Sequence, residues 1–409
     1  MVAILTVAFI LCNLDKVNMS VAVIPLSQKF GWTASDRGMV SAAFFWGYTL
    51  TQIPAGYIAS VLGGARVLGL AVFVWSFGTF LAPLAAVGGI VPLSLTRLLV
   101  GLGEGFGPPA VTGLLAKHVP ASMRARAVSI VFGGMELGNA IGLLTCGPLI
   151  ATAGWESIFY IFAVAGFVWV AAWPFLAPKE DGPAGGKGGA AQAAAVPYGQ
   201  FMTSAPVWAI IAAHFCHNWG YYTMLAWLPS YFEMLFDANA TMAGQTALIP
   251  NLAMVAMIPL VGQAADSLQN RGYSTTTVRK LAQGAAFLLP ALCMLTCAAV
   301  TPSGGLFALG SGKAIVGILS VSFAMSAWSR AGLYCNHQDL SPKYAAPLLG
   351  ITNTAGALPG ILGVMLTGKI LDATGNWSVA LFLPIALAQL FGLAVYSAFA
   401  KAEKDPRWQ

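Results

Sequence analysis

Long apolar runs, each closed by a short polar or glycine-rich segment, dominate this sequence of 409 residues. The runs are continuous and not alternating, which excludes the strands of a membrane β-barrel. A helix of about 20 apolar residues crosses a bilayer, and most runs reach that length. We therefore expect twelve spanning helices, at about residues 1–26, 34–62, 66–87, 90–116, 122–151, 155–177, 203–235, 240–268, 275–301, 307–337, 343–371 and 376–402.

Composition supports an all-α integral membrane protein. Hydrophobic residues make up 58% of the chain and charged residues 8%, whereas soluble domains carry about 25% charged residues. With the N-terminus on the cytoplasmic side, the twenty basic residues fall unevenly about the predicted spans, as the positive-inside rule requires. The cytoplasmic side takes thirteen (66, 117, 124, 126, 179, 187, 271, 279, 280, 343, 401, 404, 407), the opposite side four (29, 37, 313, 369), and the spans three (16, 97, 330). We attach no nucleic-acid meaning to the net charge of +6.

The chain divides into two similar halves. Residues 178–200 are rich in glycine and alanine and predict a flexible linker on the cytoplasmic or stromal side, between six-helix bundles over 1–177 and 201–409. Duplicated bundles of this kind place a substrate site near the middle of the membrane between the halves. Two observations indicate the repeat. Four residues recur 222 positions later, namely Pro120, Gly134, Gly138 and Trp155 as Pro342, Gly356, Gly360 and Trp377. The turn from Gly56 to Arg66 also has a counterpart in the second half, at Gly262, Asp266 and Arg271.

The fourth span carries two charges, Arg97 and Glu104, seven residues apart and therefore on one helix face. A charge at membrane depth costs a few kcal/mol on insertion scales, about 2.5–3.5 for a basic residue, and persists where it faces a bundle interior or a wet cavity. Arg97 can recognise an anion or form a structural ion pair. Glu104 can titrate, because burial disfavours its charged form, or remain in a permanent pair. Pro108-Pro109 can break or kink this helix.

The first span contains Asp15, Lys16 and Asn18 in its middle. Neighbouring residues point about 100° apart on a helix, so Asp15 and Lys16 cannot share one stripe. Lys16 can bind an anion while Asp15 binds a proton or ion; the alternative is a salt bridge that only neutralises their charges.

Polar groups also collect in the seventh and tenth spans. His214, His217 and Tyr221 share one face of the seventh span. A metal site there is disfavoured, because that helix offers no third ligand beside the two histidines. His217 either lines a cavity or packs as a hydrogen-bonded core histidine. In the tenth span Arg330 and Tyr334 lie one turn apart, and the cluster that includes His337 and Asp339 is either a gate or an ordinary helix end.

No motif indicates an enzyme or a cofactor. The chain lacks a nucleophile elbow, a metal-binding helix signature, a phosphate-cradling loop and a dinucleotide fingerprint. Because no ATP-binding motif is present, transport by this chain would be driven by an ion gradient and not by ATP. The six cysteines lie in apolar runs and read as buried small hydrophobes.

Six stretches resemble the anion:cation symporters of the major facilitator superfamily, which include vesicular glutamate transporters, sialin, and plant and algal organellar phosphate and anion transporters. They are LCNLDKVNMSVAV, FFWGYTLTQIPAGYIAS, TRLLVGLGEGFGPPA, HFCHNWGYYTMLAWLPSYF, YCNHQDLSPKYA and LLGITNTAGALPGILGV. NHQD and the His-Asn-Trp of the seventh span look most like the organellar branch, whose substrates include inorganic phosphate and, in some members, ascorbate.

The resemblance implies roles for single residues. Lys16 stands at a basic position that is usually arginine, and Arg97 matches the arginine used for the anion. Asp15 and Glu104 match acidic positions implicated in cation coupling. His217 replaces an arginine of the glutamate transporters, which weakens the case for glutamate. Ser60 replaces an aspartate that Asp266 keeps in the second half, and Arg330 adds a basic group where a neutral residue is expected.

We therefore expect a secondary transporter of a small anion, inorganic phosphate before ascorbate or a glutamate-like organic anion, coupled to Na⁺ or H⁺ by alternating access. Other readings are a non-transporting receptor on the same fold and an anion leak. We expect a monomer in a plastid membrane whose partners are the lipid bilayer and the anion, without a nucleic acid, and a first span at residue 1 suggests a trimmed precursor. The expected residues are Lys16, Asn18, Tyr48, Arg97, His217 and Tyr221 for substrate, Asp15 and Glu104 for the cation, Arg66, Asp266, Arg271, His337 and Asp339 for the gate, and Arg330 as an extra contact.

Overall fold

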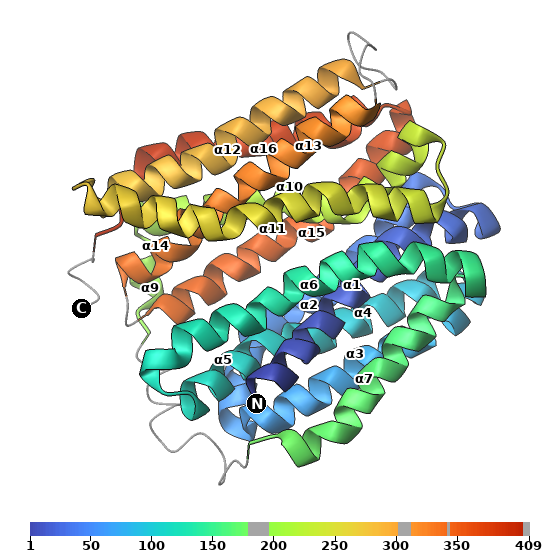
Figure 1. Ribbon diagram of the computed structural model, residues 1–409, viewed down its shortest axis with the longest axis horizontal. Coiled ribbons are helices and arrows are strands. Elements are labelled where there is room, and N and C mark those ends of the chain that lie inside the picture. Colours follow the sequence, from blue (N-terminus) through green and yellow to red (C-terminus); the bar gives the residue numbers. More distant parts are fainter. Residues whose placement is uncertain (179–195, 302–311, 342–343, 404–409) are drawn as a thin grey trace. The chain divides into compact units, whose positions relative to one another are not determined.

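The computed structural model describes residues 1–178, 196–301, 312–341 and 344–403, and these are helical with short connections (Figure 1). The first half contains α1 (Val2–Phe30), α2 (Ala34–Leu62), α3 (Gly64–Val87), α4 (Ile90–Gly105), α5 (Gly107–His118), α6 (Ala121–Ala153) and α7 (Glu156–Leu176). The second contains α9 (Tyr198–Phe201), α10 (Ala205–Phe236), α11 (Ala240–Asn270), α12 (Thr275–Val300), α13 (Gly312–Ser326), η1 (Ala327–Arg330), α14 (Leu333–Leu340), α15 (Ala345–Thr374), η2 (Ser378–Phe382) and α16 (Leu383–Phe399).

The helices confirm the predicted membrane fold. Within the described residues, ten helical segments are long and apolar enough to cross a bilayer. The two other predicted spans are α2 and α10, which are 29 and 32 residues long but carry more polar side chains. Every predicted span thus corresponds to one helix or to consecutive helices.

Contacts divide the chain into two compact units. The N-terminal unit comprises Met1–Ala195 and Ala238–Gln245, so the first residues of α11 group with it; the C-terminal unit comprises Val196–Asp237 and Thr246–Gln409. Of the predicted linker, residues 179–195 lie outside the described part, and its last residues begin helix α9.

Glycines let the helices of the N-terminal unit approach closely, which positions the charged residues. A Cβ at Gly101 of α4 would collide with the backbone of Phe44 in α2, and one at Gly138 of α6 would collide with the backbone of Ile10 in α1. Small residues of this kind are common where membrane helices pack. The close fit of α4 on α2 sets the position of Arg97, and the fit of α6 on α1 supports the helix that carries Lys16.

The C-terminal unit repeats this packing, as the sequence repeat predicts. A Cβ at Gly356, the counterpart of Gly134, would lie 2.8 Å from Cδ2 of His214 in α10. Nδ2 of Asn218 donates to the carbonyl of Gly356 at 2.8 Å, much as Nδ2 of Asn13 donates to the carbonyl of Met135 in the first unit. The repeated tryptophans, Trp155 and Trp377, are both buried at the residue before a helix. The repeat's Pro342 lies outside the described residues.

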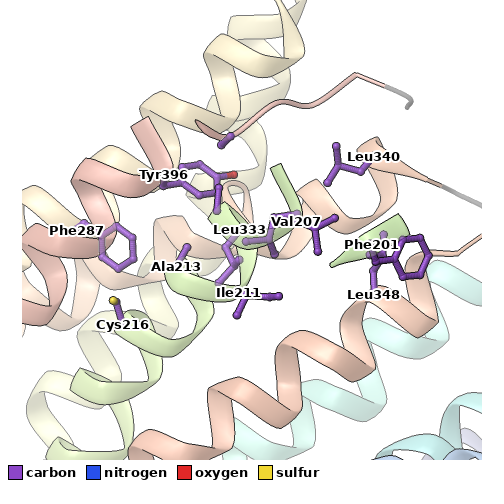
Figure 2. Close-up of a cluster of buried hydrophobic side chains, with 13 residues drawn as sticks. Phe201, Val207, Ile211, Ala213, Cys216, Phe287, Leu333, Leu340, Leu348 and Tyr396 are labelled. Carbon is purple, nitrogen blue, oxygen red and sulfur yellow. The ribbon is translucent and has the colours of Figure 1, made fainter. Parts of the chain in front are cut away.

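A cluster of buried side chains joins α10 to its neighbours (Figure 2). Figure 2 shows Phe201 of α9 beside Leu348 of α15, which explains why the end of the predicted linker is helical: it places an aromatic ring in the core. Cys216, Phe287, Leu333 and Tyr396 bring α10, α12, α14 and α16 into the same cluster.

Two spans are broken and not continuous. The fourth span is interrupted at Phe106, directly before Gly107, Pro108 and Pro109, as the proline pair predicts. The tenth span, expected as one helix, instead runs as α13, the 3₁₀ turn η1 and α14. The break lies at Gly332, where a Cβ would come within 2.8 Å of the backbone nitrogen of Gln283, and Oε1 of Gln283 accepts from Leu333 N–H at 3.0 Å.

Candidate functional site

Lys16, Glu104 and Cys12 form a buried polar group in the N-terminal unit. Nζ of Lys16 lies 3.3 Å from Oε2 of Glu104, and the two side chains are 12% and 0% exposed. The thiol of Cys12 donates to the same oxygen at 3.1 Å, and Nζ of Lys16 lies 3.5 Å from that sulfur. Oε1 of Glu104 is buried and has no hydrogen-bond partner among the described residues. One carboxylate oxygen is therefore doubly bound and the other is left unbound.

Among the described residues, no carboxylate oxygen lies within ion-pair distance of Arg97. Its Nη1 donates to the backbone carbonyl of Asp15 at 3.3 Å, and its Nε is buried without a partner in the described part of the chain. The Asp15 carboxylate instead accepts from Nδ2 of Asn18 at 3.2 Å. Arg97 is only 2% exposed, so it is a desolvated cation whose Nε has no hydrogen-bond partner among the described residues, a state that favours binding an anion.

Two aromatic rings of α2 stand against the cations. Nζ of Lys16 lies 5.3 Å from the ring centre of Tyr48 and 5.7 Å from that of Phe44, and Cζ of Arg97 lies 5.6 Å from the Phe44 ring. Such contacts stabilise a cation by about 0.5–2 kcal/mol. Phe44 thus lies next to both cations, although the sequence analysis did not single it out.

This arrangement favours exchange of partners. Glu104 is an ion-pair partner of Lys16, so an anion that bound Lys16 would compete with this carboxylate. Neutralising Glu104 with a proton or a cation would release Lys16 for the anion, because breaking a buried pair without compensation costs about 3–5 kcal/mol.

In the C-terminal unit, His217 and Tyr221 of α10 line a small cavity. Nε2 of His217 lies 3.4 Å from the hydroxyl oxygen of Ser329. Among the described residues, no cluster of three His, Cys, Asp or Glu side chains is placed to hold a metal ion.

A hydroxyl joins two histidines deeper in this unit. Oγ1 of Thr352 lies 3.1 Å from Nδ1 of His214 and 2.8 Å from Nε2 of His337, and all three residues are buried. Asn336 is buried as well and donates to the hydroxyl of Tyr396 at 2.8 Å. His337 therefore lies inside the unit and not at an exposed helix end, because Thr352 satisfies its ring.

The remaining gate candidates lie near helix ends. Arg66 is exposed in the first turn of α3, Asp266 is exposed in the last turns of α11, and Arg271 follows that helix. Asp339 pairs with Arg279 of α12, at 2.6 Å from Nε and 3.3 Å from Nη2, while Nη1 of Arg279 donates to the carbonyl of Ala331 at the break. Gating by these residues stays a prediction.

Arg330 closes the 3₁₀ turn of the broken tenth span and is exposed. Its backbone carbonyl accepts from the thiol of Cys335 at 3.2 Å. The ring of Tyr334, one turn later, lies 5.3 Å from that of His214 and 6.1 Å from that of His217.

Sequence reasoning missed several polar contacts. Cys12 was read as a small hydrophobe, yet its place four residues before Lys16 puts both on one helix face, which was the available signal. Arg279, Gln283 and Thr352 carried no comparable signal, since each acts through a partner on another helix.

Comparison with known proteins decides the family. The Major Facilitator Superfamily model matches residues 4–364. The chain belongs to the Major Facilitator Superfamily. A bacterial homologue of the human lysosomal transporter Spinster shares this fold, with a TM-score of 0.75 at 16% identity over 99% of this chain and 98% of that one. The crystal structure of a D-xylose–proton symporter also gives 0.75, at 13% identity over 98% and 97% of the two chains.

Relatives from Arabidopsis thaliana cover 97% of the chain. "Probable anion transporter 6, chloroplastic" is 44% identical over 78% of its own length. "Ascorbate transporter, chloroplastic" and "Sodium-dependent phosphate transport protein 1, chloroplastic" are each 38% identical, over 74% and 78% of their lengths. With these relatives and its apolar helices, the chain is a multi-pass protein of a plastid membrane.

Proposed function

We propose that this protein is a secondary active transporter that moves a small anion, inorganic phosphate, across a plastid membrane together with Na⁺ or H⁺. The observation that carries the proposal is the contact of Lys16 with Glu104 beside Arg97, whose buried Nε has no hydrogen-bond partner among the described residues. A buried cation is unfavourable unless its donors are satisfied, and a buried donor without a partner is suited to a ligand of opposite charge.

The charges of the N-terminal unit suggest how coupling works. When Glu104 is ionised it holds Lys16, and the anion has only Arg97 to bind. When a proton or Na⁺ occupies the free Oε1 of Glu104, the Lys16 pair weakens and both cations become available. Anion and coupling cation then bind with positive cooperativity, and together they bias the alternating-access equilibrium by their differential affinity for its states.

The relatives support this substrate class. Of the relatives whose alignment covers 97% of this chain, one is named a sodium-dependent phosphate transport protein and another a probable anion transporter. The fixed positive groups of this chain, Lys16 and Arg97, suit a compact oxyanion, since a guanidinium offers paired donors to phosphate.

An organic anion such as ascorbate is the second candidate. It is favoured by the polar, uncharged lining of the cavity at His217 and Tyr221, which suits neutral hydroxyl groups. Equal identity to the ascorbate and phosphate transporters leaves the choice to experiment.

The purified protein in liposomes tests the proposal. Labelled phosphate uptake should rise when an inward Na⁺ or pH gradient is imposed, and unlabelled phosphate should block it. Inhibition by ascorbate with little phosphate flux would move the protein to the second candidate. Absence of gradient-driven flux for every anion would contradict the transport function.

A further inference from the structure

Three buried side chains of the C-terminal unit form a hydrogen-bonded chain that the transport scheme above does not use. Oγ1 of Thr352 in α15 lies 3.1 Å from Nδ1 of His214 in α10 and 2.8 Å from Nε2 of His337 in α14. The two histidines are each 2% exposed, and Thr352 is fully buried. Buried ionisable side chains in membrane-spanning helices are rare, and in transporters they often serve as proton relays.

The backbone determines which atoms of this chain donate. Nδ1 of His337 donates to the carbonyl of Tyr334 at 3.4 Å, because a carbonyl oxygen can only accept. A neutral imidazole carries one N–H group, so Nε2 of neutral His337 accepts and the hydroxyl of Thr352 is its donor. The oxygen of Thr352 in turn accepts from the Nδ1–H group of His214. The hydrogen bonds therefore run in one direction, from His214 through Thr352 to His337.

The hydroxyl of Thr352 has a second acceptor for its proton. The carbonyl of Leu349, in the preceding turn of α15, lies 3.2 Å from Oγ1. When His337 gains a proton, its Nε2 becomes a donor, and the hydroxyl can turn its own proton to Leu349 while its oxygen accepts. The same three side chains thus stay hydrogen-bonded whether His337 is neutral or protonated.

Neither histidine is held by a fixed negative charge. In the part of the chain that the structure describes, no carboxylate forms an ion pair with His214 or His337, and Asp339 pairs with Arg279 instead. A proton bound to either ring is therefore not trapped in a permanent ion pair and can be released again. The other titratable or charged side chains that these helices and their neighbours bring close are His217, Arg330, Tyr334, Cys335 and Tyr396.

Tyr334 brings the chain of hydrogen bonds close to the surface. Its ring meets the ring of His214 edge to face, with the centroids 5.3 Å apart, and the residue is 37% exposed. His214 is thus one side-chain contact away from the accessible surface, which makes it the end at which a proton can enter.

We propose that His214, Thr352 and His337 form a proton relay, a second proton-binding site besides Glu104. A proton taken up by His214 moves on when its Nδ1–H bond breaks and an O–H bond forms at Thr352. At the same time the former O–H bond of Thr352 breaks and an N–H bond forms at Nε2 of His337. His214 ends neutral and His337 carries the positive charge, so protons and charge balance.

The relay joins α10, α14 and α15, so the position of the proton changes the hydrogen bonds between these helices. A proton that binds one state of the transporter better than another biases the alternating-access equilibrium. The proposal rests on the transport function above and narrows its coupling cation to H⁺.

Transport of labelled phosphate in liposomes tests the relay. A pH gradient drives net uptake, whereas counterflow at equal pH needs no net proton movement. Thr352→Val keeps the shape of the side chain but removes the hydroxyl, and should reduce pH-driven uptake at least about tenfold more than counterflow, since a positioned proton carrier is lost. Thr352→Ser retains the hydroxyl and should keep the coupling. Thr354→Val is the matched control on the same helix, because that hydroxyl donates to the carbonyl of Gly350 within α15, and it should leave the ratio of the two rates unchanged.

His337→Gln provides a second variant, since an amide can donate and accept but cannot carry the proton; we expect the same selective loss. Thermal unfolding of each variant in detergent shows whether it folds. PH-driven uptake that stays in proportion to counterflow in folded Thr352→Val or His337→Gln protein would overturn the relay and leave the transport function standing. Phosphate uptake by the unmodified protein that does not respond to a pH gradient would do the same, and an equal loss in Thr352→Ser would return Thr352 to a packing role. Lack of any anion flux in the unmodified protein would overturn both proposals.

Discussion

The ammonium of Lys16 lies 3.3 Å from Oε2 of Glu104, across the contact between the first and fourth spans. The thiol of Cys12 donates to the same oxygen, and the other carboxylate oxygen is buried without a partner in the part of the chain that the structure describes. A carboxylate with one oxygen bound and the other available can accept a cation while it keeps its position in the helix packing. This relationship leads to the first three predictions.

Replacing Glu104 with glutamine should separate anion movement from the cation. The amide keeps the size of the side chain but cannot hold Lys16 as an ion pair or take up a proton. We expect phosphate exchange to continue, and net uptake to lose its dependence on a Na⁺ or pH gradient. Counterflow and gradient-driven uptake in liposomes measure the two separately; an intact gradient dependence would make Glu104 a structural residue.

Replacing Arg97 with alanine should abolish uptake. Its Nε has no hydrogen-bond partner, and no carboxylate oxygen lies within ion-pair distance, among the described residues, so we assign the guanidinium to the anion and not to helix packing. Arg97→Lys keeps the charge but loses the paired donors, and should raise KM for phosphate by about tenfold or more. Phosphate binding and thermal unfolding are measured on the same preparations. Normal uptake by Arg97→Ala would rule out the substrate role.

Cys12 should matter through its hydrogen bond. Cys12→Ser retains a donor toward Glu104 and should keep most of the uptake. Cys12→Ala removes it and should shift the gradient dependence of uptake, because Lys16 alone then holds Oε2. Cys146→Ala is the matched control, since Cys146 is also a buried free cysteine of the N-terminal unit. Equal coupling in the serine and alanine variants would return Cys12 to a packing role.

Gly138 should be required for the packing of α6 on α1. Its replacement by alanine places a Cβ against the backbone of Ile10, which cannot move aside as a side chain can. Overpacking of this kind costs about 1–3 kcal/mol, so the unfolding temperature in detergent should fall. Gly133→Ala, on the same helix but with open space around it, should leave that temperature unchanged or slightly higher.

The ion pair of Arg279 with Asp339 should hold the broken tenth span to α12. Arg279→Gln removes a charge that bonds both the carboxylate and the carbonyl of Ala331, and we expect a loss of about 1–3 kcal/mol in stability. Lys280→Gln, at the next position, is the control. Thermal unfolding gives the comparison, and equal values for the two variants would show that the pair contributes nothing to stability.

The sequence alone predicted where the spans lie, and each predicted span corresponds to one helix or to consecutive helices. The thickness of a bilayer sets the length of an apolar run, and this physical limit is visible in one dimension, as the match of α2 to residues 34–62 shows. Arg97 and Glu104 stood out for a similar reason, because charges in an apolar helix are expensive and therefore informative.

Only the tertiary structure decided which partner each polar atom has. Lys16 with Glu104, Arg97 with the Asp15 carbonyl, and Gln283 with Leu333 depend on the register between helices, which glycine contacts such as Gly101 on Phe44 determine. Periodicity along one helix says which face a residue occupies but not what lies opposite. For the same reason, the cavity that His217 of α10 and Gln389 of α16 line became apparent only when these helices were placed against each other.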